Sequence, residues 1–303
     1  MREINGISVV IPALNEQDAI GSTIADIAQI LDQWGGGEGK TPYEIIVIDD
    51  GSQDETAANA ANAGAKVVSH PTNAGYGRSL KDGIIAAKYD CVAMCDADGT
   101  YPIKDLPLLL EKYLAGFDMA VGARTGDRYR QSPFKSVLRF LLKSLVEWTT
   151  GKKIPDINSG FRVFGKKEAL PFFRHLCDTF SFTTSITLAY MMNGLFVAYI
   201  PTEYYARVGS SKVRLFSDSL RTIGYVMRQI LYFDPLKIFI LFSASWLFFA
   251  FWCFVLTATT GILLGYNIGV FSIFGSFIML GLGLLAEQIR QLIVSMNDRK
   301  GEI

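Results

Sequence analysis

The chain has 303 residues, 50% of them hydrophobic, and its 29 basic and 29 acidic residues give a formal net charge of zero. This balance argues against a strongly basic nucleic-acid-binding protein, so we expect no nucleic acid among its partners. The charges are unevenly distributed: residues 238–286 contain no Asp, Glu, Lys or Arg, whereas the remainder has the composition of a soluble domain.

Short apolar strands alternate with helices along the first part of the chain. We expect strands at residues 7–13, 43–48, 65–69, 91–95 and 119–122, and helices at residues 15–33, 54–63 and 75–89. Such alternation predicts an α/β fold in which helices cover both faces of a mostly parallel sheet. Ligands of such sheets bind beyond the carboxyl ends of the strands.

Two amphipathic segments follow the predicted sheet. In residues 134–150, apolar side chains recur on one helical face, and Lys135, Arg139 and Lys143 recur on another. Residues 216–235 are similar and lead directly into the uncharged stretch. Helices of this kind lie in membrane interfaces, which is the prediction for both. Packing of the first helix on the sheet remains an open alternative.

The uncharged stretch is long enough to cross a membrane twice, because one crossing needs about 20 apolar residues. Two spans are predicted, at residues 237–259 and 267–288. The alternative is a buried helical hairpin in a soluble core. The predicted organisation is therefore a domain of residues 1–215, a juxtamembrane helix at 216–235, and a transmembrane hairpin with a short tail at 236–303.

Basic residues predict the orientation of this hairpin. They lie on both outer flanks and are missing from the turn between the spans. They are Arg214, Arg221, Arg228 and Lys237 before the first span, and Arg290, Arg299 and Lys300 after the second. Both ends, and the domain of residues 1–215, are therefore expected on the cytoplasmic side. Since Met1–Asn5 leads straight into a predicted strand, no signal peptide is expected.

The cysteines and histidines do not form a metal-binding pattern. The cysteines are Cys91, Cys95, Cys177 and Cys253. Because no two of them form a C-x-x-C pair, we expect free thiols in a reducing compartment and no zinc site. His70 and His175 lack a companion at ligand spacing, so both are expected to be structural or surface residues.

Polar clusters stand at the ends of three predicted strands. They are Asn15–Glu16, Asp49–Asp50, and the Asp96-x-Asp98 pair. Because the carboxyl ends of parallel strands share one edge of the sheet, we expect the clusters to converge there. Mg²⁺ or Mn²⁺ binds carboxylates together with substrate phosphates, so the pair predicts a metal site for a diphosphate. No Walker A motif is present, which disfavours a P-loop ATPase or kinase.

Several motifs resemble family 2 glycosyltransferases. These are "VVIPALNE" at 9–16, "VIDDGSQDET" at 47–56, "NAGYGRSLKDGI" at 73–84 and "CDADGTYP" at 95–102. Three further motifs resemble the dolichyl-phosphate mannose synthase and polyprenyl-phosphate glycosyltransferase branch: "VGAR" at 121–124, "DINSGFRVF" at 156–164 and "RVGSSKVRL" at 207–215. The resemblance covers roughly residues 5–215, and two C-terminal spans suit the bacterial-type members. It implies a GT-A fold, a Rossmann-like and mostly parallel sheet.

The resemblance also implies roles for individual residues. Those implied for the nucleotide are Pro12, Ala13, Asn15, Glu16, Asp49, Asp50, Asp96 and Ala97, with Asp96 and Asp98 as metal ligands. Those implied for catalysis are Asp98, Arg124 and Arg207. Those assigned to the acceptor phosphate are Arg124, Lys135 and Arg139, and those assigned to the sugar and a closing loop are Ser159, Gly160, Ser211 and Lys212.

Plainer roles remain open for several of these residues. Arg124 could be a surface residue, and Lys135 and Arg139 could contact only anionic headgroups. Asp54 could be no more than a helix N-cap, and Asp156 could fix a loop without touching a ligand.

The implied reaction is the inverting, metal-dependent transfer of one sugar from a nucleotide sugar to a polyprenyl phosphate, giving a β-linked product. UDP-glucose and GDP-mannose are the leading donors, with UDP-glucose slightly favoured, and a homo-oligomer in the membrane is expected. The chain departs from the pattern at Thr183, Thr184 and Ser185, where relatives usually have an acidic residue. This departure weakens any inference about sugar orientation.

Three rival functions are considered. A processive polysaccharide synthase would carry a Gln-x-x-Arg-Trp signature, which this sequence lacks. A glycosyltransferase acting on another glycan or glycolipid acceptor stays open. A non-catalytic membrane adaptor would have no need of three carboxylate clusters on one edge of a sheet.

Overall fold

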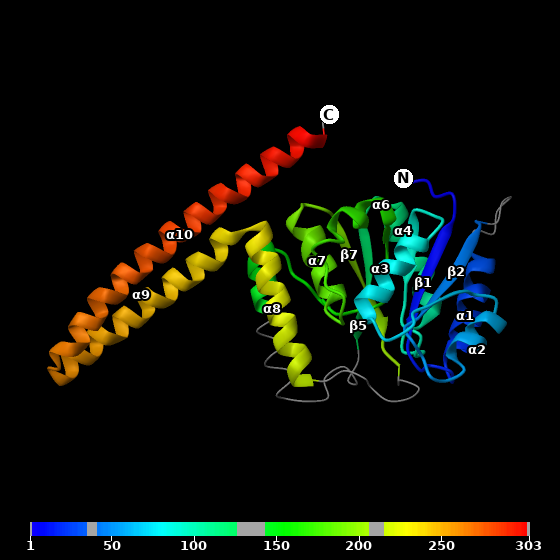
Figure 1. The fold of residues 1–303 in the computed structure, drawn as a ribbon, viewed down its shortest axis with the longest axis horizontal. Helices are drawn as coiled ribbons and strands as arrows, with labels where there is room; N and C mark the ends of the chain where they lie inside the picture. The colour runs from blue at the N-terminus through cyan, green and yellow to red at the C-terminus, as the bar shows by residue number, and fades with distance from the viewer. Residues whose placement is uncertain (1, 35–40, 126–142, 206–214, 302–303) are drawn as a thin grey trace. The chain divides into compact units, whose positions relative to one another are not determined.

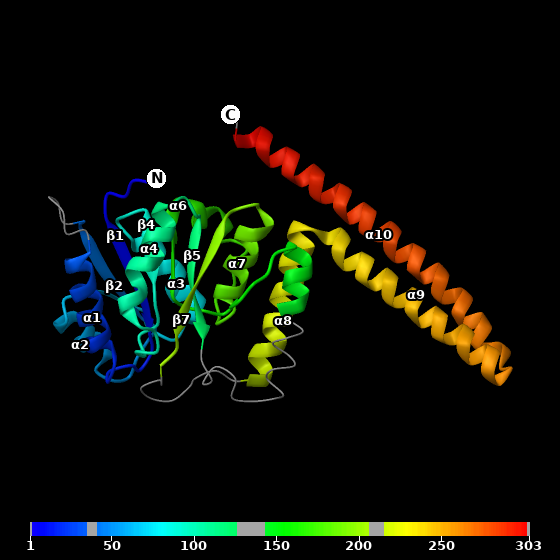
Figure 2. The same cartoon turned by 180° about the vertical axis from the view of Figure 1, so that it is seen from behind.

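The computed structural model describes residues 2–34, 41–125, 143–205 and 215–301. The chain forms two compact units, residues 1–225 and 226–303 (Figures 1 and 2). The boundary between them falls inside helix α8 (Leu215–Phe233), which covers most of the segment predicted as a juxtamembrane helix. The membrane-interface role of that helix stays a prediction.

A seven-stranded sheet organises the first unit. Its strands are β1 (Ile7–Ala13), β2 (Tyr43–Asp49), β3 (Lys66–Ser69), β4 (Cys91–Met94), β5 (Met119–Thr125), β6 (Arg162–Gly165) and β7 (Val197–Glu203). Their order is β3-β2-β1-β4-β6-β5-β7. Only β6 is antiparallel to its neighbours, β4 and β5. The predicted mostly parallel α/β sheet is therefore confirmed.

Helices cover both faces of this sheet. They are α1 (Ile20–Gln33), α2 (Thr56–Asn62), α3 (Tyr76–Ala86), η1 (Ile103–Asp105), α4 (Leu106–Leu114), α6 (Lys166–Ala169), η3 (Leu170–Phe172) and α7 (Phe182–Met192). Residues 143–150, in the first predicted amphipathic segment, form a separate helix. Helix α3 packs on β1 and β2 and also contacts α7. Helix α1 contacts α2 and η1, and α4 packs on β5 and β6.

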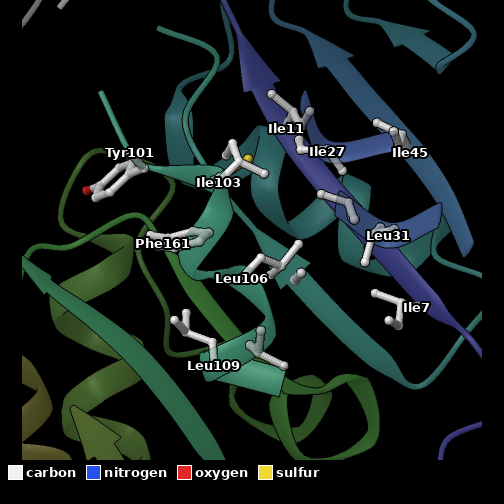
Figure 3. Close-up of a cluster of buried hydrophobic side chains, with 14 of the residues drawn as sticks. Ile7, Ile11, Ile27, Leu31, Ile45, Tyr101, Ile103, Leu106, Leu109 and Phe161 are labelled. Carbon is white, nitrogen blue, oxygen red and sulfur yellow. The ribbon is translucent and has the colours of Figure 1, made fainter. Parts of the chain in front are cut away.

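The period-two pattern of the strands explains these two layers. Alternate β1 residues Ile7, Val9 and Ile11 join the cluster formed with α1 and α4. Figure 3 shows this cluster, with Ile27 and Leu106 among the labelled side chains. The intervening Val10 lies on the other side, where α3 packs. Each fully buried aliphatic side chain contributes about 1.5–3 kcal/mol to stability, so the two layers hold the strand ends in place.

Helix α3 approaches the sheet so closely that a methyl group at Gly83 would lie 2.3 Å from the Val10 side chain and 3.1 Å from that of Ile48. We expect Gly83→Ala to destabilise the fold by about 1–3 kcal/mol, because overpacking forces the neighbouring atoms apart. The matched control is Gly21→Ala in α1, which meets nothing within 4 Å and should be neutral or stabilising. Hydrogen exchange of β1 measures both effects, and equal exchange in the two variants would contradict the close contact.

Sequence and structure differ mainly at the helix starts and in the second half of the sheet. Helix α1 begins at Ile20 rather than residue 15, because Asn15 has a φ of 49°, outside the right-handed helical region. Strand β5 extends to Thr125 instead of ending at residue 122. Strands β6, which has four residues, and β7, which has seven, were not predicted from the sequence.

The second unit contains helices α9 (Pro235–Thr260) and α10 (Leu263–Gly301). Both are long and apolar enough to cross a membrane, over residues 235–260 and 263–293. The turn between them is shorter than the predicted break, because Gly261 adopts the left-handed conformation that ends α9 within one residue. Gly265 and Tyr266, which lie between the two predicted spans, therefore belong to α10.

Small residues bring α9 and α10 together. A methyl group at Gly269 would lie 2.8 Å from Phe254, and one at Gly283 would lie 2.6 Å from Phe239. Between these positions, the hydroxyl groups of Ser243 and Ser276 form a 2.7 Å hydrogen bond. Close backbone approach and a buried hydroxyl pair are typical of helices that associate in lipid.

Candidate functional site

The strand directions bring the predicted polar clusters to one edge of the sheet. Strands β1, β2 and β4 run parallel, so Asn15–Glu16, Asp49–Asp50 and Asp96–Asp98 follow their carboxyl ends on the same side. The antiparallel β6 contributes the loop that precedes it, residues 156–161, to the same edge. The predicted convergence is confirmed, and the loop before β6, in which the resemblance had assigned Ser159 and Gly160 to the sugar, lies at the same edge.

The loops after β1 and β2 brace each other. The Asn15 backbone N–H donates to Ser52 Oγ at 2.8 Å, and its side-chain oxygen accepts from the Gln53 N–H at 2.8 Å. The Glu16 N–H donates to Thr56 Oγ1 at 2.8 Å. Asp54 accepts from the N–H and hydroxyl of Thr56 at the start of α2. Burial alone would raise the pKa of Asp54, but these hydrogen bonds lower it, so its carboxylate holds the loop in ionised form.

Asp49 and Asp50 are buried, and they bond to the loops around them. Asp50 accepts hydrogen bonds from the Ala74 N–H at 2.8 Å and the Gly75 N–H at 2.9 Å, which fixes the chain entering α3. His70 Nδ1 also lies 2.8 Å from Asp50, so the histidine has the structural setting predicted for it. Asp49 accepts from the Ser52 N–H at 3.1 Å. The implied contact of Asp50 with the base stays a prediction.

Asp96 lies between the loop before β6 and the first residue of α3. The Tyr76 hydroxyl donates to Asp96 Oδ1 at 2.8 Å. Burial, followed by the negative charge of Asp96, raises the pKa of Tyr76 well above 10, so the phenol keeps its proton and remains a donor. Tyr76 also stacks on Phe180, with ring centroids 5.4 Å apart. The Asp96 carboxylate is thus held in one orientation.

Gly160 leaves the space that this carboxylate occupies. A methyl group there would lie 2.7 Å from Asp96 Oδ1, 2.8 Å from Oδ2 and 2.9 Å from the Tyr76 hydroxyl. The Gly160 N–H donates to the Tyr101 hydroxyl at 2.8 Å, which fixes the loop at this point. The sequence resemblance placed Gly160 near the sugar; the structure places it against Asp96.

We expect Gly160→Ala to lower the rate of sugar transfer by about 10²-fold, because a displacement of about 1 Å in a reacting group has that effect. The alanine would push the Asp96 carboxylate aside without demanding a new backbone conformation. Steady-state kinetics, with circular dichroism to verify folding, tests this. Unchanged kcat in a folded Gly160→Ala variant would show that Asp96 needs no fixed position. Gly21→Ala serves as the control substitution.

Asp98 is 5% exposed and closes a tight turn after β4. Its Oδ1 accepts from the Thr100 hydroxyl at 2.6 Å and from the Thr100 N–H at 3.2 Å. Gly99, inside this turn, has a φ of 68°, which favours glycine. The loop beyond β7 reaches the same turn, since the Tyr205 N–H donates to the Thr100 carbonyl at 2.9 Å.

Arg124, near the end of β5, is paired with Asp156. Its Nε and one terminal nitrogen donate to the two Asp156 oxygens at 2.6 and 2.9 Å. The guanidinium also lies over the Tyr204 ring, 5.4 Å from its centroid. Burial would raise the pKa of Asp156, but the charge and hydrogen bonds of Arg124 lower it. The open question about Asp156 is therefore answered in part: it orients Arg124 and anchors its loop.

The fully buried Arg162 stabilises the same loop, residues 156–161, through hydrogen bonds. Arg162 donates to the carbonyls of Ser159 and Ile157 at 2.7 and 3.0 Å and to the Thr187 hydroxyl at 2.6 Å. The Ser159 hydroxyl donates to the Gly122 carbonyl at 2.6 Å. Burial lowers the pKa of Arg162, and these oxygens offset the cost of enclosing its charge. The Ser159 hydroxyl thus bonds to the protein backbone, and its assignment to the sugar stays a prediction.

Neutral side chains replace the acidic residue expected in α7. Thr183, Thr184 and Ser185 are all buried, and Thr184 donates to the Asn158 side-chain oxygen at 2.6 Å. Helix α7 is therefore tied to the loop before β6 through hydroxyl contacts.

The carboxylates fit a divalent cation bound together with phosphate. Among the residues the structure describes, no group of three or more His, Cys, Asp or Glu side chains could hold a metal. Asp96 and Asp98 alone suit Mg²⁺ or Mn²⁺, which is usually bound by one or two carboxylates plus substrate oxygens. A diphosphate approaching two carboxylates without a cation would be repelled, so the donor set favours a metal shared with the ligand.

Part of the predicted site lies outside the described residues: Lys135, Arg139, Arg207, Ser211 and Lys212. Pro12 and Ala13 end β1, and Ala97 separates the two aspartates. The sequence reasoning missed Tyr76, Tyr101 and Arg162. All three stand inside motifs that had been quoted, but a buried role cannot be predicted from motif position alone. All four cysteines are free and buried, as expected.

Comparison with known proteins agrees with this geometry. Residues 8–170, more than half of the chain, match the family model described as glycosyl transferase family 2. Undecaprenyl-phosphate 4-deoxy-4-formamido-L-arabinose transferase of Edwardsiella ictaluri is 28% identical over 98% of this chain and 93% of its own length. Dolichyl-phosphate hexose transferase of Haloferax volcanii is 28% identical over 70% of this chain and 88% of its own.

Solved structures share the fold. Glucosyl-3-phosphoglycerate synthase from Mycobacterium tuberculosis, in complex with Mn²⁺, UDP-glucose and phosphoglyceric acid, superimposes with a TM-score of 0.60 at 22% identity. The match covers 74% of this chain and 79% of that one. The same synthase with Mg²⁺ and UDP gives a TM-score of 0.59.

Proposed function

The chain belongs to glycosyl transferase family 2, and we propose that it transfers one sugar from a nucleotide sugar to the phosphate of a polyprenyl phosphate at a membrane surface. The observation that carries this proposal is the combination of two features in one chain. One is the set of carboxylates converging at one edge of the sheet, and the other is the pair of helices apolar enough to cross a membrane.

The relatives support the choice of acceptor. The two relatives compared above are named for transfer to undecaprenyl phosphate and dolichyl phosphate. A lipid acceptor also explains why a sheet domain is joined to an apolar hairpin, since the acceptor's phosphate lies at headgroup level. The basic residues that flank the hairpin support a cytoplasmic location for the catalytic unit.

The donor diphosphate would bind at the Asp96–Asp98 turn. Asp96 and Asp98 would hold Mg²⁺ or Mn²⁺, as the complexes of the solved neighbours support. When bound, the cation neutralises charge on the departing nucleoside diphosphate. The chain's own task is positioning: Tyr76 and Gly160 fix Asp96, and Thr100 fixes Asp98. The loops after β1 and β2 form the nucleoside side of the site.

The acceptor needs little activation, because a phosphate monoester with a second pKa of about 6 is mostly dianionic near pH 7. Catalysis then consists of orienting this oxygen and balancing its charge. Arg124, fixed by Asp156 and by the Tyr204 ring, is the residue we assign to the acceptor phosphate.

Attack opposite the leaving group inverts the anomeric centre. The proposed product is a β-linked polyprenyl-phosphate sugar when the donor is α-linked, as UDP-glucose and GDP-mannose are. UDP-glucose is the favoured donor and GDP-mannose the alternative. The anomeric coupling constant in the NMR spectrum of the purified product measures the linkage, and an α linkage would contradict inversion.

A donor screen tests the proposal. The full chain in lipid nanodiscs is incubated with a short polyprenyl phosphate, Mn²⁺ and a panel of nucleotide sugars, and the lipid phase is analysed by mass spectrometry. One donor should yield a polyprenyl-phosphate sugar, and the Asp98→Asn variant should not. Nucleotide binding without any lipid product, for every donor in the panel, would show that the acceptor is of another kind.

A further inference from the structure

His70 contacts two carboxylates, one just after strand β2 and one on helix α3. Its Nδ1 lies 2.8 Å from Asp50 Oδ1, and its Nε2 lies 3.2 Å from Asp82 Oδ2. The His70 side chain is 12% exposed, and that of Asp50 is 6% exposed. Both nitrogens of a largely buried imidazole thus face acidic side chains, and the reaction proposed above gives neither contact a role.

The neighbours of His70 orient its ring. The His70 backbone N–H donates to the Asp49 carbonyl at 2.8 Å, which continues the pairing of β3 with β2. On helix α3, Asp82 is held by Arg78, whose Nε donates to Asp82 Oδ2 at 2.7 Å. Because an ionised carboxylate only accepts hydrogen bonds, either neutral tautomer of His70 donates to one of its two partners, and the imidazolium donates to both. His70 therefore links the end of β2 to α3.

The Asp50 carboxylate keeps one acceptor position within the described part of the chain. Its Oδ1 faces His70 and accepts from the Ala74 N–H, and its Oδ2 accepts from the Gly75 N–H. Each carboxylate oxygen has two lone pairs, so one position remains on Oδ2. A single N–H of a ligand would complete the hydrogen bonding of this carboxylate.

A nucleobase is the ligand group that fits this position. Under the proposed function, the loops after β1 and β2 form the nucleoside side of the site, and Asp50 directly follows the last residue of β2. Uracil and guanine carry a ring N–H at the position where cytosine and adenine carry a lone pair. A carboxylate accepts from the first pair of bases and repels the second at that position, so its orientation decides which donors bind.

We propose that His70 is a positioning residue for donor selection, which holds Asp50 so that its remaining acceptor position meets the ring N–H of a uracil or guanine base. The inference rests on the proposed function for the presence of a nucleotide. It deepens that function by naming the side chain that orients the base-reading carboxylate. Asp82, and Arg78 behind it, orient His70 in turn.

Two amide substitutions separate the two contacts of His70. In His70→Asn the amide nitrogen takes the place of Nδ1, so it reaches Asp50 but not Asp82. In His70→Gln it takes the place of Nε2, so it reaches Asp82 but not Asp50. Circular dichroism verifies that both variants fold. The matched control is His175→Gln, at the chain's other histidine.

Calorimetric titration of the full chain in nanodiscs measures the base preference, with Mn²⁺ and UDP, CDP, GDP or ADP as the probes. The native protein should bind UDP over CDP, or GDP over ADP, by at least about tenfold. His70→Asn and His175→Gln should keep this preference. His70→Gln should lower it about tenfold, because a hydrogen bond to a charged group contributes about that factor.

Hydrogen exchange without nucleotide gives a second readout. In His70→Gln the Ala74 and Gly75 amides, which donate to Asp50, should exchange faster, whereas those of β1 should not. An equal base preference in His70→Asn and His70→Gln, or no preference in the native protein, would overturn the role of His70 alone. If the native protein bound none of the four nucleotides, the proposed function would fall with it, so the two failures are told apart.

Discussion

Asp98→Asn should reduce sugar transfer on the order of 10³-fold while leaving the fold intact. Asparagine keeps the side-chain oxygen that accepts from the Thr100 hydroxyl and N–H, so the turn after β4 is preserved. What is lost is the negative charge that would hold the cation beside the donor diphosphate. The measurement is kcat in the transfer assay together with calorimetric titration of Mn²⁺ in the presence of nucleoside diphosphate.

The control for this variant is the tyrosine that fixes the neighbouring aspartate. Tyr76→Phe removes one hydrogen bond to Asp96 but no metal ligand, so Mn²⁺ binding should weaken far less than in Asp98→Asn. A folded Asp98→Asn protein with normal activity and normal Mn²⁺ affinity would remove Asp98 from the metal site.

Asp156→Asn should have the largest effect on stability, about 3 kcal/mol, because it leaves Arg124 without its anionic partner. The Asp156 side chain is 1% exposed and that of Arg124 is 14% exposed, so water replaces little of the lost interaction. Hydrogen exchange in strands β5 and β6 measures the change. Asp178→Asn is the matched control, since its ion pair with Lys81 involves a carboxylate that is 56% exposed and should contribute less than about 1 kcal/mol.

The pH dependence of this pair has a definite sign. The folded state lowers the pKa of Asp156 from its ordinary value of 3.8. The stabilisation from Asp156 is therefore complete above the pKa that Asp156 has in the unfolded chain. It is lost as the pH falls through the lower pKa of the folded state. The stability difference between the native protein and Asp156→Asn should be constant from pH 7 to about pH 5 and should shrink below about pH 4. A difference that grows on acidification would contradict the ion pair.

The first half of the sheet and its edge could be predicted because their signals lie in short stretches of neighbouring residues. Buried runs such as Ile7–Ala13 end in turn-forming or acidic residues, and parallel strands bring those ends together. The two apolar helices could be predicted from the uncharged residues 238–286.

The rest of the fold and of the site depends on features that no short stretch of sequence predicts. Strand β6 is short and antiparallel, and it was not predicted, although the motif at residues 156–164 had assigned the loop before it to the site. The pairing of Arg124 with Asp156 joins residues 32 positions apart, and nothing local links them. The turn between α9 and α10 is shorter than predicted. A single glycine with positive φ, Gly261, ends helix α9, and the sequence pattern does not reveal this conformation.

The proposed acceptor is the phosphate of a membrane lipid. The most direct test compares polyprenyl phosphate with the same polyprenol lacking phosphate and with soluble 3-phosphoglycerate, using the donor that the screen identifies. We expect sugar on polyprenyl phosphate alone, and none in the Asp98→Asn variant. Transfer to the polyprenol at an equal rate, or transfer to 3-phosphoglycerate with none to the lipid phosphate, would contradict it.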